Sequence, residues 1–322
     1  MIAEVLNAST RRKMLLHGKK RRAKLFKDWQ TANPTLVDSV ADDIMAYHVQ
    51  YEYVAEAARD AKPRLEAPAP ATNKGKSHKV AVDAAEPTPG SPKKYAALSC
   101  QVNIIINSAQ LVVVRAGGGT TTFMHLLARH MLPTKGFIAY PDRWRVRYAD
   151  TTPRIFNTTV MENLKFGNNY DHSEDEINGL LGYIGADSLI DQGDREVGFN
   201  GCKLSLTERV MVSVARILLS SPDLVLICSG IETLLPDQQL KIMKVFHDLI
   251  EHRGLPCLSS EMSNTPTHLK KRKTVIVSTK TQRIMDLADV VIPPFGSIAS
   301  ASAEDAREDP PPAPGADSYC SP

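Results

Sequence analysis

The chain is organised around residues 110–132, where a short apolar segment runs into three consecutive glycines. Residues 111–114 are all apolar, which predicts a buried strand. Gly117, Gly118 and Gly119 follow, and then three threonines. The next apolar residues have helical spacing: Phe123, Leu126, Leu127 and Met131. Strand, glycine loop and helix in this order are typical of a phosphate-binding loop, because the loop amides and the helix N-terminus converge on one anion.

The loop lacks part of the usual side-chain set. In the pattern G-x-x-x-x-G-K-[ST] the lysine neutralises phosphate charge, and Thr120 occupies its position here. Val114 stands at the position of the first glycine, so only Gly119 and the hydroxyl of Thr121 match. Glycine-rich turns without phosphate are common. The candidate phosphate-contacting residues are Gly117, Gly118, Gly119, Thr120, Thr121 and Thr122.

Composition indicates a globular protein. The chain has 322 residues, 43% of them apolar and 23% charged, which allows one large domain or two ordinary ones. Its five cysteines have neither CxxC spacing nor an obvious pairing, so we expect an intracellular location, cytoplasmic or mitochondrial. No apolar run is long enough to span a bilayer, so we expect no transmembrane segment in this chain.

Residues 1–30 form a basic tail. Nine Lys or Arg residues and no acid lie in the arm at residues 11–27. Three interpretations stay open: a solvated tail, an arm that binds nucleic acid or a ribonucleoprotein through phosphates, or an organelle presequence, which Glu4 disfavours.

Residues 31–62 predict an amphipathic helix. Thr35 and Asp38 form a capping-box pattern just after Pro34. Apolar or aromatic residues then recur in heptad steps: Val37, Val40, Ile44, Tyr47, Tyr51, Val54 and Ala58. Because a linker separates this helix from the main domain, we expect its 35–58 stripe to dock on a protein partner. Packing of the stripe within the protein is the alternative.

Two segments are expected to be disordered. They are a Pro/Ala-rich linker at residues 63–94 and an acidic, Pro-rich tail at residues 297–322. Between them, residues 95–296 predict strands at 102–106, 111–114, 137–140, 145–148, 223–227, 273–277 and 290–292. Helices are predicted after the glycine loop, within 174–205, at 208–219 and at 236–252. We expect 137–140 and 145–148 to pair. The alternation predicts an α/β domain around a mostly parallel sheet.

Four stretches of this domain resemble the nucleotide-binding domain of ABC transporters, most closely the multidrug-resistance-associated subfamily. They are IFNTTVMENLKFG (155–167), REVGFNGCKLS (195–205), ARILLSSPDLVLI (215–227) and ADVVI (288–292). The resemblance covers roughly residues 98–298. It implies a P-loop NTPase (ABC ATPase-like) fold with a central sheet and a helical subdomain.

The same resemblance implies that the side chains with which the family handles ATP are replaced. The Q-loop glutamine falls on Thr151, the Walker B aspartate on Cys228, the catalytic glutamate on Ser229, the D-loop aspartate on Leu235 and the switch histidine on Lys280. The LSGGQ signature falls on residues 204–208, where Leu206 would obstruct a phosphate and Glu208 would repel it.

Phosphoryl transfer depends on positioning and on neutralising charge. We therefore predict that the chain is not an enzyme, with no catalytic residue and no metal ligand. We expect no cofactor, with weak ATP binding without magnesium as the alternative.

Two functions are weighed against each other. The first is a catalytically inactive ABC ATPase-like pseudoenzyme that serves as a scaffold, a structural and protein-interaction subunit of a larger assembly. The alternative is a degenerate nucleotide-binding domain of an ABC transporter system, binding ATP beside an active ATPase or a membrane partner. In that case residues 151–163 should contact an ABC transmembrane partner. A decayed fragment without function is a third interpretation.

Overall fold

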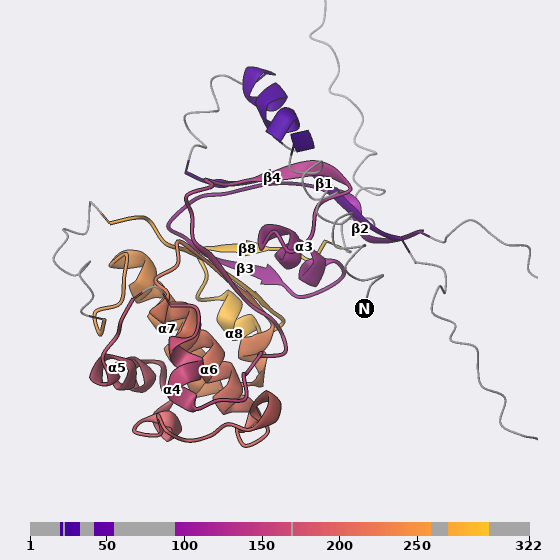
Figure 1. The fold of residues 1–322 in the computed structure, drawn as a ribbon. Helices are drawn as coiled ribbons and strands as arrows, with labels where there is room; N and C mark the ends of the chain where they lie inside the picture. Colours follow the sequence, from indigo (N-terminus) through magenta and orange to yellow (C-terminus); the bar gives the residue numbers. More distant parts are fainter. Residues whose placement is uncertain are drawn as a thin grey trace, which may run out of the picture.

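The computed structural model describes residues 20–32 without 22, 42–54, 94–168, 170–258 and 270–295 (Figure 1). The backbone alone is described at 52–54 and 94–101. The rest of the predicted basic tail, nearly all of the predicted linker and the whole of the predicted C-terminal tail lie outside the described residues. Among the described residues, no helix is both long and apolar enough to cross a bilayer.

The centre of the domain is a parallel sheet of five strands. In spatial order they are β5 (Val146–Ala149), β6 (Leu224–Cys228), β7 (Thr274–Thr279), β3 (Leu111–Arg115) and β8 (Val290–Ile292). Every pairing between neighbours is parallel. β6 and β7 are buried along their whole length, because helices or a second sheet cover both faces. The predicted α/β domain with a mostly parallel sheet is confirmed.

Helices divide between the two faces of this sheet (Figure 1). Helix α3 (Thr120–Leu127) covers one face. The other carries α4 (Val160–Lys165), α5 (Glu174–Ile184), α6 (Leu206–Leu219), α7 (Pro236–Glu251) and α8 (Gln282–Met285). Short 3-10 turns lie at Asp187–Leu189, Phe199–Gly201 and Gly230–Thr233.

Strand β3 lies between two apolar cores, and its side chains alternate between them. Leu111 and Val113 pack in the core that contains the helices α4 to α8. Val112 and Val114 pack with α3 in the second core. Side chains in a strand point alternately to its two faces, so the parity of a residue in β3 decides which core it reaches.

A second sheet covers α3. It is antiparallel, in the order β2 (Lys94–Ile106), β1 (Ile44–Val54) and β4 (Lys135–Ala139). Ile44 and Val49 from β1 share one core with Phe123 from α3. The second core therefore lies between the two sheets.

The prediction of an amphipathic helix at 35–58 is wrong over residues 44–54, which form strand β1. Register shifts interrupt its pairing with β2 at Ala46/Val49 and Val49/Tyr51. Such bulges break the strict two-residue alternation, so the apolar residues imitate helical spacing. The segment is rich in β-branched and aromatic residues, which favour a strand. Ile44 is buried inside the domain whereas Tyr47 is exposed, so the predicted stripe does not form one continuous face for a partner.

Two local predictions are also corrected. Residues 137–140 and 145–148 do not pair, since β4 joins β1 and β5 joins β6. Asp223, just before β6, holds β5 in the parallel sheet by accepting a hydrogen bond from the Arg145 amide at 2.8 Å. The helical stretch expected over 174–205 is an α-helix only at Glu174–Ile184.

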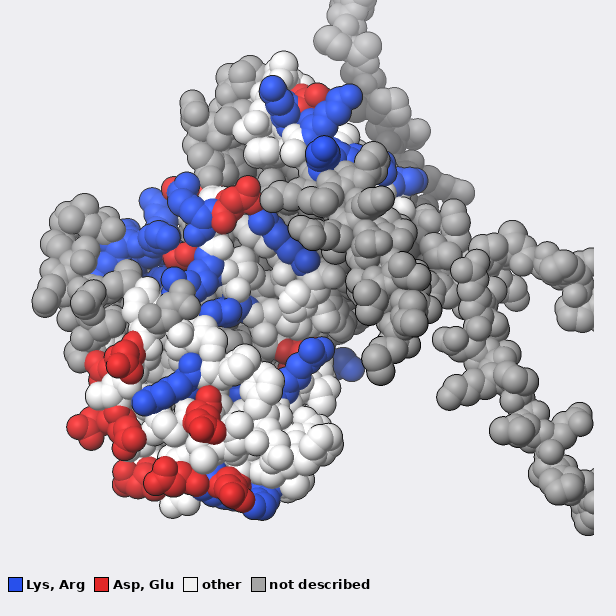
Figure 2. Space-filling model, in the orientation of Figure 1, with Lys and Arg blue, Asp and Glu red and all other residues white. Residues whose placement is uncertain are grey.

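Part of the basic tail packs on the antiparallel sheet. Residues 20–32, apart from 22, are helical. The rings of Phe26 and Phe137 lie 5.7 Å apart, and those of Trp29 and Tyr47 lie 6.4 Å apart. The basic side chains described on this helix are exposed: Lys20, Arg21, Lys24 and Lys27. Figure 2 shows Lys and Arg gathered over this helix, whereas acidic side chains gather around α5.

Asn163 connects the segment before α4 to α6. It is fully buried, and its Oδ1 accepts from the Phe156 amide and from Arg216 Nη2, both at 2.9 Å. Its side-chain amide donates to the Phe156 carbonyl at 3.0 Å and to Thr158 Oγ1 at 2.9 Å. Burial lowers the pKa of Arg216 to about 10, so the guanidinium stays charged at neutral pH and depends on these acceptors.

The assignment of β1 can be tested at Val49, which is buried in the strand but lies off the predicted heptad stripe. We expect Val49→Ala to lower the free energy of unfolding by about 2 kcal/mol, because two methyl groups leave a packed core. Ile105→Ala in the neighbouring strand, where the side chain is 52% exposed, should cost under about 1 kcal/mol. Denaturant titration measures both. Equal, small losses would contradict the strand.

We expect Asn163→Ala to cost about 3 kcal/mol of unfolding free energy, because it leaves buried backbone groups of Phe156 and the Arg216 charge without partners. Asn178→Ala is the matched control, since Asn178 bonds Asp191 at the surface. That change should cost under about 1 kcal/mol. Thermal unfolding of both variants provides the comparison, and similar losses would argue against a structural role for Asn163.

Candidate functional site

The residues singled out in the sequence meet at one edge of the parallel sheet. The phosphate loop follows β3, Thr151 follows β5, Cys228 ends β6 and Lys280 follows β7. The carboxyl ends of parallel strands share an edge, where ligands of open α/β sheets bind. The structure therefore brings together segments that are more than 100 residues apart, as in the 107-residue separation of Thr121 and Cys228.

The loop closes on itself through Thr120. Gly119 caps α3 in the left-handed region, with φ at 81°, where a side chain is disfavoured. The buried Thr120 Oγ1 accepts from the Gly117 amide at 3.2 Å and donates to the Arg115 carbonyl at 3.1 Å. Thr120 thus uses one loop amide, whereas the side chain of Thr121 is exposed and that of Thr122 is buried.

Hydroxyl groups surround the buried thiol of Cys228. The thiol donates to Thr121 Oγ1 at 3.9 Å, and the hydroxyls of Thr151 and Ser278 donate to Sγ at 3.8 and 3.7 Å. These are the segments that the resemblance aligns with the family's metal-binding residues. Magnesium prefers hard oxygen ligands and carboxylates, and a thiol is a soft ligand. The donor set of Thr121, Thr151 and Cys228 does not fit Mg²⁺.

Two carboxylates at this edge escaped the sequence analysis as site residues. Glu232 Oε1 accepts from the Lys280 amide at 2.5 Å and from Thr279 Oγ1 at 3.1 Å. Asp150 Oδ1 accepts from the Thr151 amide at 2.8 Å. Each follows a predicted strand within a few residues, which is the signal that could have identified both.

Ser229 lies between these groups. Its backbone is in the left-handed region, with φ at 51°, and its amide donates to Ser278 Oγ at 3.0 Å. The two hydroxyl oxygens, Oγ of Ser229 and Oγ of Ser278, are 3.2 Å apart. Ser229 at the end of β6 is therefore held by β7 and not by the phosphate loop.

Glu208 caps the helix that follows the signature segment. Its amide donates to Ser205 Oγ at 3.2 Å, and its Oε2 accepts from the Ser205 amide at 2.7 Å. Arg195 forms an ion pair with it at 3.1 Å. Burial alone would raise the pKa of Glu208, but the Ser205 hydrogen bonds and Arg195 hold it below its usual value. The charge expected to repel phosphate is thus balanced locally. Leu206 is exposed.

An exposed aromatic pair lies on the helical side. Phe156 and Phe166 flank α4, are 41% and 55% exposed, and their ring centroids are 4.2 Å apart. The Arg216 guanidinium lies 5.5 and 5.9 Å from the two ring centroids. Phe156 lies within the segment 151–163 for which the resemblance implied a transmembrane partner, and Phe166 lies three residues beyond it.

Comparison with known proteins gives relatives by sequence. A multidrug resistance ABC transporter ATP-binding and permease protein of Lactococcus lactis is 25% identical over 163 residues, 46% of this chain and 28% of that protein. An ATP-dependent permease of Candida albicans is 26% identical over 187 residues, 53% of this chain and 27% of that protein. The chain thus spans less than a third of the length of these relatives. A scan against models of protein families matched none.

A solved structure shares the fold. A bacterial Atm1-family ABC exporter with ATP bound superposes with a TM-score of 0.54 at 15% identity, covering 78% of this chain and 37% of that one. The nucleic-acid partner considered for residues 11–27 finds no support among these relatives.

The prediction that the chain is not an enzyme is wrong in the light of these relatives, which are named as ATP-binding or ATP-dependent proteins. It rested on side-chain identity at aligned positions, and it rejected Glu232 because this residue lies three positions beyond Ser229. The sequence relatives and the order of the elements confirm the predicted resemblance. This chain is similar in sequence to ABC transporter ATP-binding and permease proteins and shares its fold with part of an ABC exporter.

Proposed function

We propose that this chain is the ATP-binding part of an ABC transport system and works with a membrane-spanning partner. The observation that carries the proposal is the glycine loop between β3 and α3, at the carboxyl edge of an ABC-type sheet. The relatives named above combine ATP-binding and permease functions in a longer protein. In this proposal the permease function belongs to another chain or to another part of a longer protein. The nucleotide site lies on the intracellular side of the membrane.

The proposed phosphate contacts come mainly from the backbone. Amides of Gly118 and Gly119 and the N-terminus of α3 supply the donors, and the exposed Thr121 hydroxyl adds one more. Thr120 bonds within the loop, so no side chain replaces the lysine charge. We therefore expect weaker ATP binding than a lysine-containing loop gives. No magnesium ligand is assigned.

Nucleotide binding can be tested by titrating a fluorescent ATP analogue. Gly119→Val should weaken binding by about tenfold or more, because a β-branched residue is strained at this positive φ and distorts the loop. Gly167→Val is the matched control: Gly167 also has a positive φ, 74°, with open space around it, and lies outside the loop. The control should retain binding.

Two outcomes would contradict the site. One is the same affinity in Gly119→Val and the parent chain. The other is an equal loss in both valine variants, which would attribute the effect to general destabilisation. Circular dichroism of each variant separates loss of binding from loss of fold.

The partner surface is proposed at Phe156 and Phe166. Exposed aromatic residues are enriched at protein interfaces, and Arg216 and Asn163 fix the backbone beneath this pair. An apolar or aromatic segment of a transmembrane protein would bury both rings. The comparisons favour this arrangement over the scaffold function considered from sequence, because the relatives are transport proteins by name.

A photo-crosslinking residue at position 166 tests this surface in native membranes. We expect an adduct with an ABC transmembrane protein, identified by mass spectrometry, and about a tenfold lower yield when Phe156→Ser is added. Position 199 is the control, because Phe199 is also an exposed aromatic residue, at 81% exposure. It lies in the 3-10 turn Phe199–Gly201, before the signature segment. Adducts with a transmembrane protein from position 199 alone would refute the assignment.

A further inference from the structure

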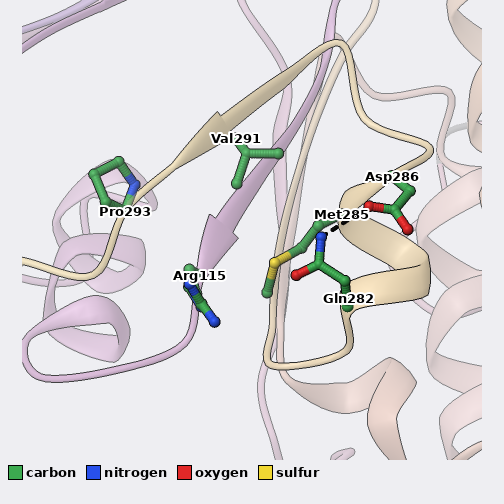
Figure 3. A pocket seen from close by; sticks show the side chains of 6 residues that line it. All are labelled: Arg115, Gln282, Met285, Asp286, Val291 and Pro293. Atoms are coloured by element: carbon green, nitrogen blue, oxygen red, sulfur yellow. Dashed lines mark hydrogen bonds between the residues drawn. The ribbon is translucent and has the colours of Figure 1, made fainter.

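We propose that a pocket on the α8 side of the parallel sheet binds a small monocarboxylate with a short aliphatic tail. The pocket has a volume of about 300 Å³, at the lower end of the range for small-molecule sites. Its lining comes from the ends of β3 and β8 and from one face of α8 (Figure 3): Arg115, Gln282, Met285, Asp286, Val291 and Pro293.

The alternation of the strands places this pocket on the face of the sheet opposite α3. Arg115 has the parity of Leu111 and Val113, which face the helical core. Val113 is in register with Val291 in β8. Arg115 and Val291 therefore project to the α8 side, whereas α3 lies on the other side (Figure 3). The arginine next to the phosphate loop in sequence is thus directed into a separate pocket.

Arg115 is available to a ligand. Within the part of the chain that the structure describes, no hydrogen bond or ion pair involves its guanidinium, and its side chain is exposed. Its backbone is fixed, because its carbonyl accepts from Thr120 Oγ1 at 3.1 Å and the residue is paired with Thr279 of β7. The planar guanidinium can match a carboxylate with two parallel hydrogen bonds.

The other walls define the rest of the ligand. Met285, Val291 and Pro293 offer apolar surface beside Arg115. Asp286 supplies a negative charge to the lining, and its Oδ1 accepts from Gln282 Nε2 at 2.8 Å. One cation and one carboxylate in a small pocket favour a ligand with a single negative charge, because a second charge would be repelled by Asp286. This argues for an aliphatic monocarboxylate rather than phosphate or a dicarboxylate.

Binding is tested on the full chain with valerate as the probe. The chain has ten methionines, so methyl-labelled methionine gives a simple NMR spectrum in which Met285→Leu identifies the Met285 signal. We expect that signal to shift in a saturable way, with a dissociation constant on the order of 1 mM for so few ligand atoms. Valeramide, which has the same shape without the charge, should bind about tenfold more weakly or not at all.

Two variants isolate the recognition. Arg115→Gln should weaken valerate binding by about tenfold or more. Arg115→Lys keeps the charge without the planar fork, so its affinity for valerate should lie between those of the parent chain and Arg115→Gln. Arg283→Gln is the matched control. Arg283 is an exposed arginine of helix α8, but it does not line the pocket. Asp286→Asn should increase the affinity for glutarate and inorganic phosphate. Unchanged signals from the other methionines verify the fold of each variant.

The proposal fails if valerate and valeramide bind alike, or if Arg115→Gln and Arg283→Gln have the same effect. It also fails if phosphate or glutarate binds the parent chain more tightly than valerate. Each of these readouts is independent of ATP, so the proposed nucleotide site could be refuted while the pocket is supported, or the reverse.

Discussion

The burial of β3 between two cores is the constraint on which the rest of the molecule depends. Its four apolar residues 111–114 have no exposure, so the strand can only sit where both faces are covered. Even positions pack with α3 and the antiparallel sheet, and odd positions pack with the helical layer. The chain leaves β3 through the glycine loop, so the position of this strand also fixes where the loop, Arg115 and α3 lie.

The edge that β3 shares with its neighbours is held by neutral groups. Thr120 bonds within the loop, and the Cys228 thiol lies among three hydroxyls. Neutral hydrogen bonds of this kind satisfy the polar groups at this edge without bringing like charges close together. The described carboxylates nearby, Asp150 and Glu232, accept hydrogen bonds from backbone amides.

The parallel sheet was predictable from sequence, because strands buried on both faces read as continuous apolar runs, as at 224–227 and 275–277. Strand β1 was not. Its bulges give heptad-like spacing, and its partners β2 and β4 are far away in the chain, so no local pattern reveals the pairing. The positions of Thr121, Thr151 and Cys228 at one edge followed from the resemblance. The role of Glu208 was missed, although Ser205 and Glu208 have the sequence spacing of a capping box. The ion pair of Glu208 with Arg195 depends on the fold and is not readable from a local pattern.

The wrong prediction about enzymatic activity can be explained by the geometry of the same edge of the sheet. Alignment asks whether one position in the sequence holds one type of side chain. Electrostatics depends instead on which groups are within reach in space, and a loop can bring a carboxylate to an edge from a different position. Glu232 lies four residues beyond Cys228, yet its carboxylate accepts the Lys280 amide at the end of β7, because the 3-10 turn Gly230–Thr233 folds back against the sheet. An argument from missing residues is therefore complete only when the neighbouring turns have also been traced.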